Sequence, residues 1–181
     1  MTDRTNQAST GLRSPETDFR EGLLALIPHL RAFARGLSGR PDFADDLVQE
    51  TVMRAWAARE RYQPDTNMRA WTFTILRNHF LNDLRRASRT TELVDDGIDL
   101  PGMVSPPAQE DAVHVSDLEA ALLRLPDDRR EALLLVGAGG FSYDEAADIC
   151  GVPAGTIKSR VARGRAQLTG ILGEDPAGDQ A

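Results

Sequence analysis

The stretch FSYDEAADICGVPAGTIKSRVARGRAQ, residues 141–167, predicts two short helices joined by a tight turn. Ser142 and Glu145 stand at the spacing of a capping box, in which each side chain binds the free backbone N–H of the other residue. The first helix is therefore expected to begin at Ser142. Gly151 marks the turn, because glycine takes a positive φ without steric cost.

The second of these helices is basic. Its apolar residues Ile157 and Val161 are four apart and share one face. Residues 154–168 hold four basic residues and no acidic one. A basic helix that begins at a turn suits the major groove of DNA, where its first residues meet base edges and phosphates. The stretch predicts a DNA-reading helix-turn-helix, and the alternative is a packed helical hairpin with a solvated charged face.

Composition limits what the rest of the chain can be. Its 181 residues, 41% of them hydrophobic, have room for one domain or two small ones. The net charge of −7 argues against a protein that coats nucleic acid unaided, since phosphate contact needs a positive field. Cys150 is the single cysteine, which excludes an intramolecular disulfide and fits a reducing cytoplasm.

Several functional classes are not expected. The first 17 residues lack the apolar core of a signal peptide, and no window approaches the roughly 20 apolar residues of a membrane-spanning helix. The three histidines are far apart, and we find no catalytic constellation. We therefore expect a cytoplasmic protein that is not an enzyme and binds no metal, cofactor or membrane.

The chain is expected to be all-α, with two small helical domains. The first domain covers residues 18–87 and the second covers residues 114–172. Between them, residues 88–113 contain three prolines and most of the acidic excess, which predicts a flexible acidic linker that lets the domains move semi-independently. A long loop packed on one domain is the alternative. Residues 1–17 and 173–181 are expected to be tails.

Three or four helices are expected in the first domain. Its first helix contains Pro28, which either kinks the helix or opens its second half. A second helix has its apolar stripe between residues 44 and 56, and its polar residues project elsewhere. A third helix is expected at residues 68–86, where Trp71 and Phe73 are assigned to the core.

Three runs of residues carry a resemblance to a known family. They are DDLVQET at residues 45–51, MRAWTFTILRN at residues 68–78, and Leu125-Pro126 followed by the helix-turn-helix. In this order they resemble a sigma factor of the extracytoplasmic-function (ECF) group. FSYDEAA at residues 141–147 and GTIKSRV at residues 155–161 are similar to the EcfG type, which runs the general stress response of alphaproteobacteria.

The resemblance implies a bacterial transcription initiation subunit. Residues 18–87 would be sigma region 2, which binds core RNA polymerase and the −10 element. Residues 114–172 would be sigma region 4, whose helix-turn-helix binds the −35 element. The implied partners are the β′ clamp helices and β flap of core polymerase, promoter DNA, and an anti-sigma factor of NepR type. A response regulator that mimics a sigma factor would compete for this anti-sigma factor and so release the sigma factor, which is expected to be a monomer.

The resemblance also assigns roles to surface residues. The implied core polymerase-binding residues are Asp45, Asp46, Gln49, Glu50 and Arg54. A solvated helix face is the alternative interpretation of this set. The implied −10 contacts are Asn67, Arg77, Asn78, Asn82, Arg85 and Arg86. The implied −35 contacts are Thr156, Lys158, Ser159, Arg160 and Arg163.

Three rival interpretations remain open at this point. A sigma-like decoy would bind the anti-sigma factor without touching DNA, but such proteins carry a phosphoreceiver domain for which the chain has no length left. A free-standing helix-turn-helix regulator would usually dimerise, and no dimer helix follows residue 172. An enzyme acting on nucleic acid would need an acidic metal cluster or a nucleophile arrangement.

Overall fold

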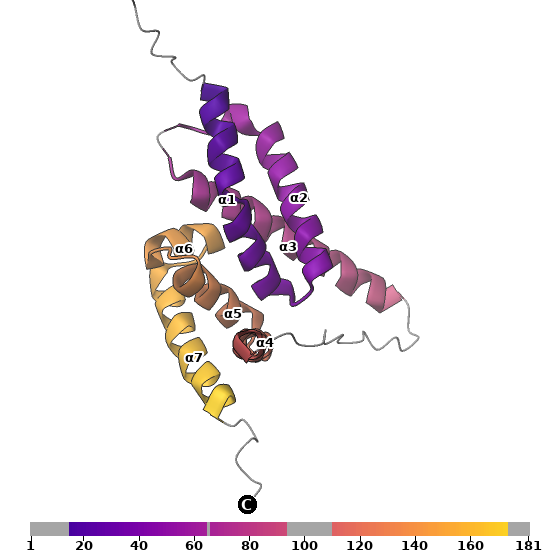
Figure 1. Ribbon diagram of the computed structural model, residues 1–181, viewed down its shortest axis with the longest axis vertical. Helices are drawn as coiled ribbons and strands as arrows, with labels where there is room; N and C mark the ends of the chain where they lie inside the picture. The colour runs from indigo at the N-terminus through magenta and orange to yellow at the C-terminus, as the bar shows by residue number, and fades with distance from the viewer. Residues whose placement is uncertain (1–14, 65, 94–109, 174–181) are drawn as a thin grey trace, which may run out of the picture.

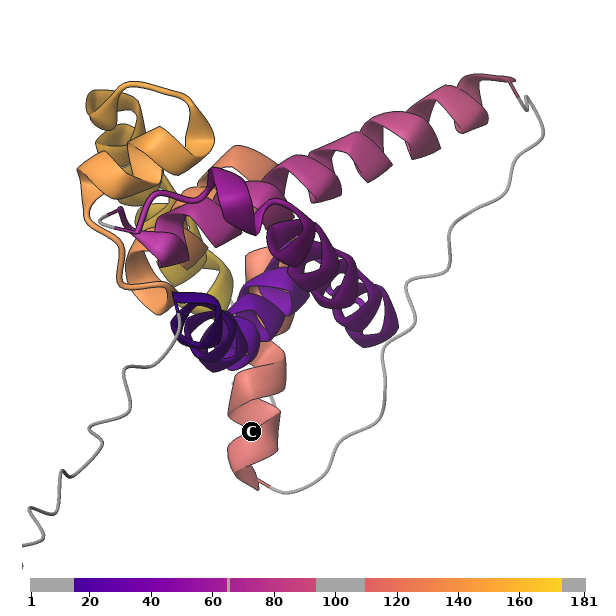
Figure 2. The ribbon, with the colours of Figure 1, turned by 90° about the horizontal axis from the view of Figure 1, so that it is seen from above.

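The computed structural model describes residues 15–64, 66–93 and 110–173, and within these ranges it contains helices and no strand. The all-α class is therefore confirmed. In chain order the elements are α1 Pro15–Ser38, α2 Pro41–Ala57, the 3₁₀ turn η1 Arg59–Arg61, α3 Met68–Leu93, α4 Glu110–Leu123, α5 Asp127–Leu133, the π-helical turn η2 Leu134–Ala138, α6 Tyr143–Cys150 and α7 Ala154–Gly173. Figures 1 and 2 show their arrangement.

The first domain is a bundle of α1, α2 and α3. Figure 1 shows α1 and α2 side by side with α3 crossing them. Leu30, Leu47, Phe73 and Leu76 are the large side chains buried at its centre, none more than 2% exposed. The helix α1 continues through Pro28 without a break. Phe73 belongs to the main cluster and Trp71 packs on a second, smaller one, so the assignment of these two residues to the interior is confirmed.

The second domain contains α4 to α7. The helices α6 and α7 form the predicted helix-turn-helix, with the apolar residues Ile157 and Val161 of α7 at most 2% exposed. Its turn is fixed by Gly151, whose φ of 66° lies in the left-handed region. The predicted capping box of Ser142 and Glu145 is present at the start of α6. Each of these local signals in the sequence is confirmed.

Gly151 allows a direct stability test. Changing Gly151→Ala should cost about 1–2 kcal/mol of unfolding free energy, because an L-residue is strained in the left-handed region. Nothing lies within 4 Å of the added Cβ, so no steric clash contributes. Urea denaturation measures the loss, and Gly155→Ala is the matched control, since Gly155 lies in α7 and also has open space around it. Equal stability of the two variants would contradict this account of the turn.

Three helix ends differ from the boundaries expected from sequence. The helix α1 begins at Pro15, inside the expected N-terminal tail. The helix α3 continues past Ala87 to Leu93, and no Pro or Gly interrupts the sequence there. The helix α4 already begins at Glu110. The flexible linker expected at 88–113 falls mostly on residues 94–109, which lie outside the described residues, as do nearly all residues of the two expected tails.

The two domains pack directly against each other. Helix α3 contacts α6, and α1 contacts η2, α4 and α5. The rings of Phe73 and Phe141, one from each domain, meet edge to face with centroids 4.9 Å apart. Gly36 lies so close to Leu134 that an added Cβ would come within 2.6 Å of its side chain. The described residues therefore share one core that crosses the domain boundary, and we call this contact the seam. Semi-independent domains were expected, but this structure shows them docked.

Candidate functional site

The exposed face of α7 carries most of the residues that were predicted to contact the −35 element. Lys158 and Arg163 are exposed, whereas Thr156 and Ser159 are half-buried. The guanidinium of Arg163 donates to the Ser159 hydroxyl at 2.9 Å, and that hydroxyl donates to the Thr156 carbonyl at 2.9 Å. These bonds hold the Arg163 side chain along the helix surface. The helix-turn-helix thus presents a basic face whose first turns are preorganised.

Arg160 lies differently from the other predicted −35 residues. Its Nε is 3.1 Å from Asp128 Oδ2 in α5, and its side chain is 22% exposed. The ion pair ties α7 to α5 within the second domain. A phosphate contact by Arg160 would compete with Asp128, so we expect its role to be partly structural.

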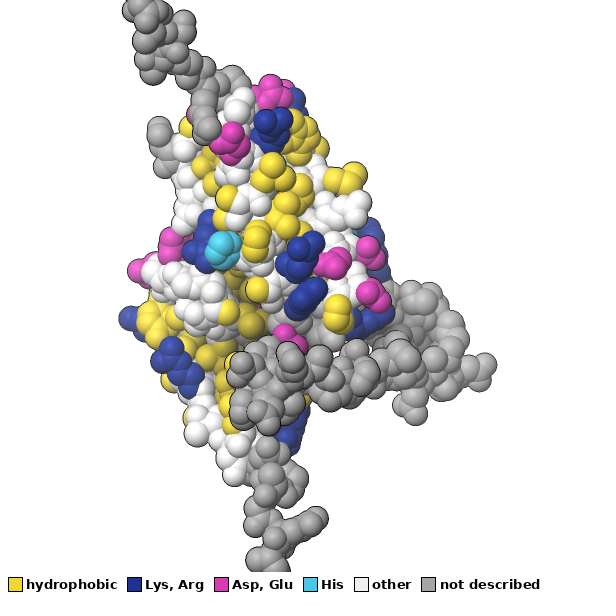
Figure 3. All heavy atoms as spheres, viewed as in Figure 1, with side chains coloured by type: hydrophobic (Ala, Val, Ile, Leu, Met, Phe, Trp, Pro, Cys, Tyr) yellow, Lys and Arg dark blue, Asp and Glu magenta, His cyan; other side chains and the backbone are white. Residues whose placement is uncertain are grey.

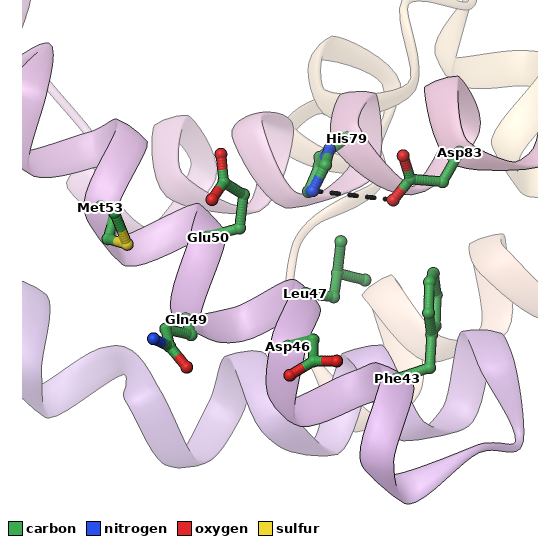
Figure 4. A pocket seen from close by; sticks show the side chains of 8 residues that line it. All are labelled: Phe43, Asp46, Leu47, Gln49, Glu50, Met53, His79 and Asp83. Carbon is green, nitrogen blue, oxygen red and sulfur yellow. Dashed lines mark ion pairs between the residues drawn. The ribbon is translucent and has the colours of Figure 1, made fainter. Parts of the chain in front are cut away.

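A groove runs between α2 and α3 in the first domain. Its volume is about 450 Å³, and it is lined by Phe43, Asp46, Leu47, Gln49, Glu50, Met53, His79 and Asp83. Figure 4 shows the polar side chains around an apolar floor, with His79 Nε2 at 3.6 Å from Asp83 Oδ2. Met53 is 58% exposed, which makes it an apolar contact open to a partner.

Some of the predicted polymerase-binding residues line this groove and others do not. Asp46, Gln49 and Glu50, which were predicted to lie on the polar face of this helix, line the groove. Arg54 donates to Glu50 at 2.8 Å, and this hydrogen bond holds the pKa of the Glu50 carboxyl below its usual range, so Glu50 is ionised at neutral pH. Asp45 instead accepts from Arg31 of α1 at 2.7 Å and does not line the groove.

Sequence reasoning missed five residues of the groove, of which Leu47 was expected only as part of the apolar stripe of α2. Phe43 and Met53 belong to α2, and His79 and Asp83 belong to α3. The i,i+4 spacing of His79 and Asp83 is visible in the sequence and favours an ion pair on one helix face. What the sequence does not show is that α3 lies beside α2 at this point.

The predicted −10 residues on α3 fall into two groups. Asn78, Asn82, Arg85 and Arg86 are exposed along the helix. Arg77 turns toward the second domain, where its Nε and Nη2 donate to the two carboxylate oxygens of Glu131 at 2.7 and 3.3 Å. These five predicted residues of α3 therefore do not share one exposed face, and the sixth predicted residue, Asn67, precedes the helix.

Asn67 also faces the second domain. Its amide nitrogen donates to Glu145 Oε1 at 2.6 Å, and its amide oxygen accepts from the Ala70 N–H at 3.1 Å. The second bond satisfies a free N–H of the first turn of α3. Both polar atoms of the Asn67 side chain are thus occupied.

Further contacts complete the seam. The guanidinium of Arg69 lies 4.7 Å from the centroid of the Phe141 ring and donates to the Gly139 carbonyl. Beside the seam, within the second domain, Cys150 of α6 donates its thiol proton to Glu131 of α5 at 3.5 Å, and burial raises the pKa of this thiol to about 12. Cys150 is therefore a protonated, unreactive thiol at neutral pH.

Neither a metal site nor a membrane span is formed by the residues that the structure describes. No group of three or more His, Cys, Asp or Glu residues in the described ranges is arranged to hold a metal ion. Among the helices that the structure describes, none combines the length and apolar character of a membrane span.

A basic helix-turn-helix in one domain is typical of a DNA-binding protein, and an acidic, partly apolar groove in the other is typical of a protein-docking surface. The family follows from comparison with known proteins. Sigma-70 region 2 matches residues 24–90 and Sigma-70, region 4 matches residues 116–168, and the chain belongs to the ECF RNA polymerase sigma factors.

Relatives support this assignment at the level of sequence and fold. The ECF RNA polymerase sigma factor EcfG of Rhodopseudomonas palustris strain TIE-1 is 51% identical, over 91% of both chains. The sigma factor RpoE, solved in complex with the anti-sigma factor NepR from Bartonella quintana, is 46% identical with a TM-score of 0.79, covering 87% of this chain and 98% of that one. CnrH, solved with the cytosolic domain of CnrY, is 27% identical with a TM-score of 0.64, covering 87% and 88%.

Proposed function

We propose that this sigma factor binds core RNA polymerase through the groove between α2 and α3 and directs it to promoters of general stress response genes. In this proposal residues 18–87 bind core polymerase and the −10 element, residues 114–172 bind the −35 element, and no catalytic step belongs to the chain itself. In the same proposal the chain acts in the cytoplasm, together with core polymerase. The 51% identity to EcfG over 91% of the chain supports the assignment to the stress response.

The groove is the observation that carries this proposal. Its carboxylates and apolar floor suit a basic amphipathic helix, because charge-assisted hydrogen bonds set the register while apolar contacts supply burial. Figure 3 shows charged side chains of both signs beside exposed hydrophobic ones over α1 and α2, a mixture typical of a protein-docking surface. Figure 1 places α2 and α7 on opposite sides of the molecule, so polymerase and the −35 element would be bound separately.

We further propose that an anti-sigma factor of NepR type holds this chain inactive. The proposal rests on the likeness to RpoE, which was solved bound to NepR. Polymerase and inhibitor would then compete for the groove. Purified inhibitor should displace the chain from core polymerase, and simultaneous binding of both would contradict the competition.

In vitro transcription with purified core polymerase and a promoter library tests the DNA-reading role. Arg163→Ala should reduce transcription from a subset of promoters, because an arginine pairs with guanine through two hydrogen bonds. The loss of such a pair should cost about 1–3 kcal/mol of discrimination between bases. Arg165→Ala is the matched control, since Arg165 is an exposed arginine two residues further along α7 and projects from a different face. Equal losses at every promoter in the library would contradict the assignment of Arg163 to base reading.

A further inference from the structure

The side chain of Arg163 is held by a single residue that lies one helical turn earlier. Its Nε donates to the Ser159 carbonyl at 3.2 Å, and its Nη2 donates to the Ser159 hydroxyl at 2.9 Å. We propose that Ser159 is a positioning residue, which does not read DNA itself but aims the guanidinium of Arg163 at one base pair of the −35 element. This role rests on the proposed function, in which the exposed face of α7 binds that element.

The hydroxyl of Ser159 has no proton left for DNA. A serine hydroxyl donates one hydrogen bond and accepts up to two. Its proton goes to the Thr156 carbonyl at 2.9 Å, and one of its lone pairs accepts from Arg163. Phosphate oxygens only accept hydrogen bonds, so this hydroxyl cannot bind the DNA backbone while both bonds persist. Ser159 is also half-buried, whereas Arg163 is exposed, as expected for a supporting residue and a reading residue.

The two hydrogen bonds from Arg163 use one particular edge of its guanidinium. The group is planar and carries five N–H donors in a rigid fork. Nε and Nη2 form the side edge, and both donate to Ser159. The end edge, made of one N–H of Nη1 and the second N–H of Nη2, is not used by Ser159. Two N–H groups of this kind match the O6 and N7 acceptors of guanine, so Ser159 leaves Arg163 in a form suited to that base.

Positioning of this kind should affect the choice of base more than the stability of the fold. Ser159 orders the Arg163 side chain before DNA arrives, so the pairing with the correct base does not have to pay for that ordering. Loss of the Ser159 hydroxyl should therefore reduce the preference for that base about fivefold, the usual effect of ordering one long side chain. The helix itself should stay as stable, because alanine is the best helix former.

The base preferences of the holoenzyme test this role. Core polymerase with each variant transcribes a promoter library that is randomised through the −35 element, and sequencing of the RNA gives the preference at every position. Arg163→Ala marks the base pair that Arg163 reads. Ser159→Ala should lower the preference at this base pair about fivefold and leave the other positions unchanged. Ser159→Thr should behave as the parent, because a threonine hydroxyl in a helix also bonds the carbonyl one turn earlier.

A double-mutant cycle separates positioning from direct contact. If Ser159 acts through Arg163, Ser159→Ala should change nothing further in an Arg163→Ala chain. Thr169→Ala is the matched control, because it removes an exposed hydroxyl from the same helix and should leave every base preference unchanged. A loss that persists without Arg163, or that falls on a different base pair, would show that Ser159 contacts DNA itself and would overturn the proposal. Parental base preferences in Ser159→Ala would also overturn it.

A measurement on the free chain tests the same role without polymerase. NMR relaxation of the arginine Nε–H groups gives an order parameter for each side chain. The value for Arg163 should exceed that for Arg165, an exposed arginine on another face of α7, and Ser159→Ala should lower it to the Arg165 value. Equal values for the two arginines in the parent would overturn the role of Ser159. Failure of the chain to direct core polymerase to any promoter would contradict the proposed function instead.

Discussion

Replacing Asp46 by arginine is expected to weaken the binding of core RNA polymerase about a hundredfold, because a like-charge contact in an interface costs several kcal/mol and each 1.4 kcal/mol is tenfold. Asp46 is exposed at the groove, beside Gln49 and Glu50, so the reversed charge would face the incoming helix. The expected loss applies to every promoter, since polymerase binding precedes promoter choice. Fluorescence anisotropy with labelled chain and purified core polymerase measures the dissociation constant.

The control for this prediction is charge reversal away from the groove. Glu60 is an exposed acid in η1 that does not line the groove, so Glu60→Arg changes the net charge by the same amount. Its affinity for core polymerase should stay within about threefold of that of the parent, as expected for an exposed charge outside an interface. If both reversals weaken binding equally, the effect is one of overall charge and the groove is not the docking site.

Replacing Phe73 by alanine is expected to cost about 3–5 kcal/mol of unfolding free energy, the usual range for deleting a fully buried phenylalanine. The Phe73 side chain is 0% exposed. Its ring centroid lies 5.0 Å from that of Phe33 in its own domain and 4.9 Å from that of Phe141 across the seam. The cavity would therefore weaken the bundle and the docking of the second domain together. Urea denaturation followed by circular dichroism measures the loss.

A half-buried phenylalanine provides the comparison. Phe43 lies at the groove and is partly exposed, so Phe43→Ala removes the same atoms from a site that water already reaches. Its cost should stay near 1 kcal/mol, well below the value for a core position. Similar losses for the two variants would show that Phe73 is not the shared centre of the core.

Local features of the fold could be predicted because each depends on neighbouring residues. The capping box of Ser142 and Glu145 and the positive φ of Gly151 need only one turn of chain, and both are confirmed. The burial of Ile157 and Val161 follows from helical spacing alone. The boundary of α3 was harder, because no Pro or Gly marks its end.

The seam could not be predicted, because its pairs are far apart in sequence. Arg77 and Glu131 are separated by 54 positions, and Asn67 and Glu145 by 78. Periodicity assigns each residue to a face of its own helix and says nothing about which helix of the other domain meets it. The groove shows the same limit, since three polar residues on its α2 side were predicted and none of its α3 residues was. The predicted roles of all these residues in binding polymerase and DNA stay predictions.

We propose that the first domain holds core polymerase and the −10 element while the second binds the −35 element, so that the chain sets where transcription starts. The most direct measurement mixes purified core polymerase and genomic DNA with and without the chain and maps the 5′ ends of the RNA. We expect the chain to be retained by core polymerase and to create a set of start sites that core polymerase alone does not use. Core polymerase that fails to retain the chain, or that starts RNA at the same positions without it, would contradict the account.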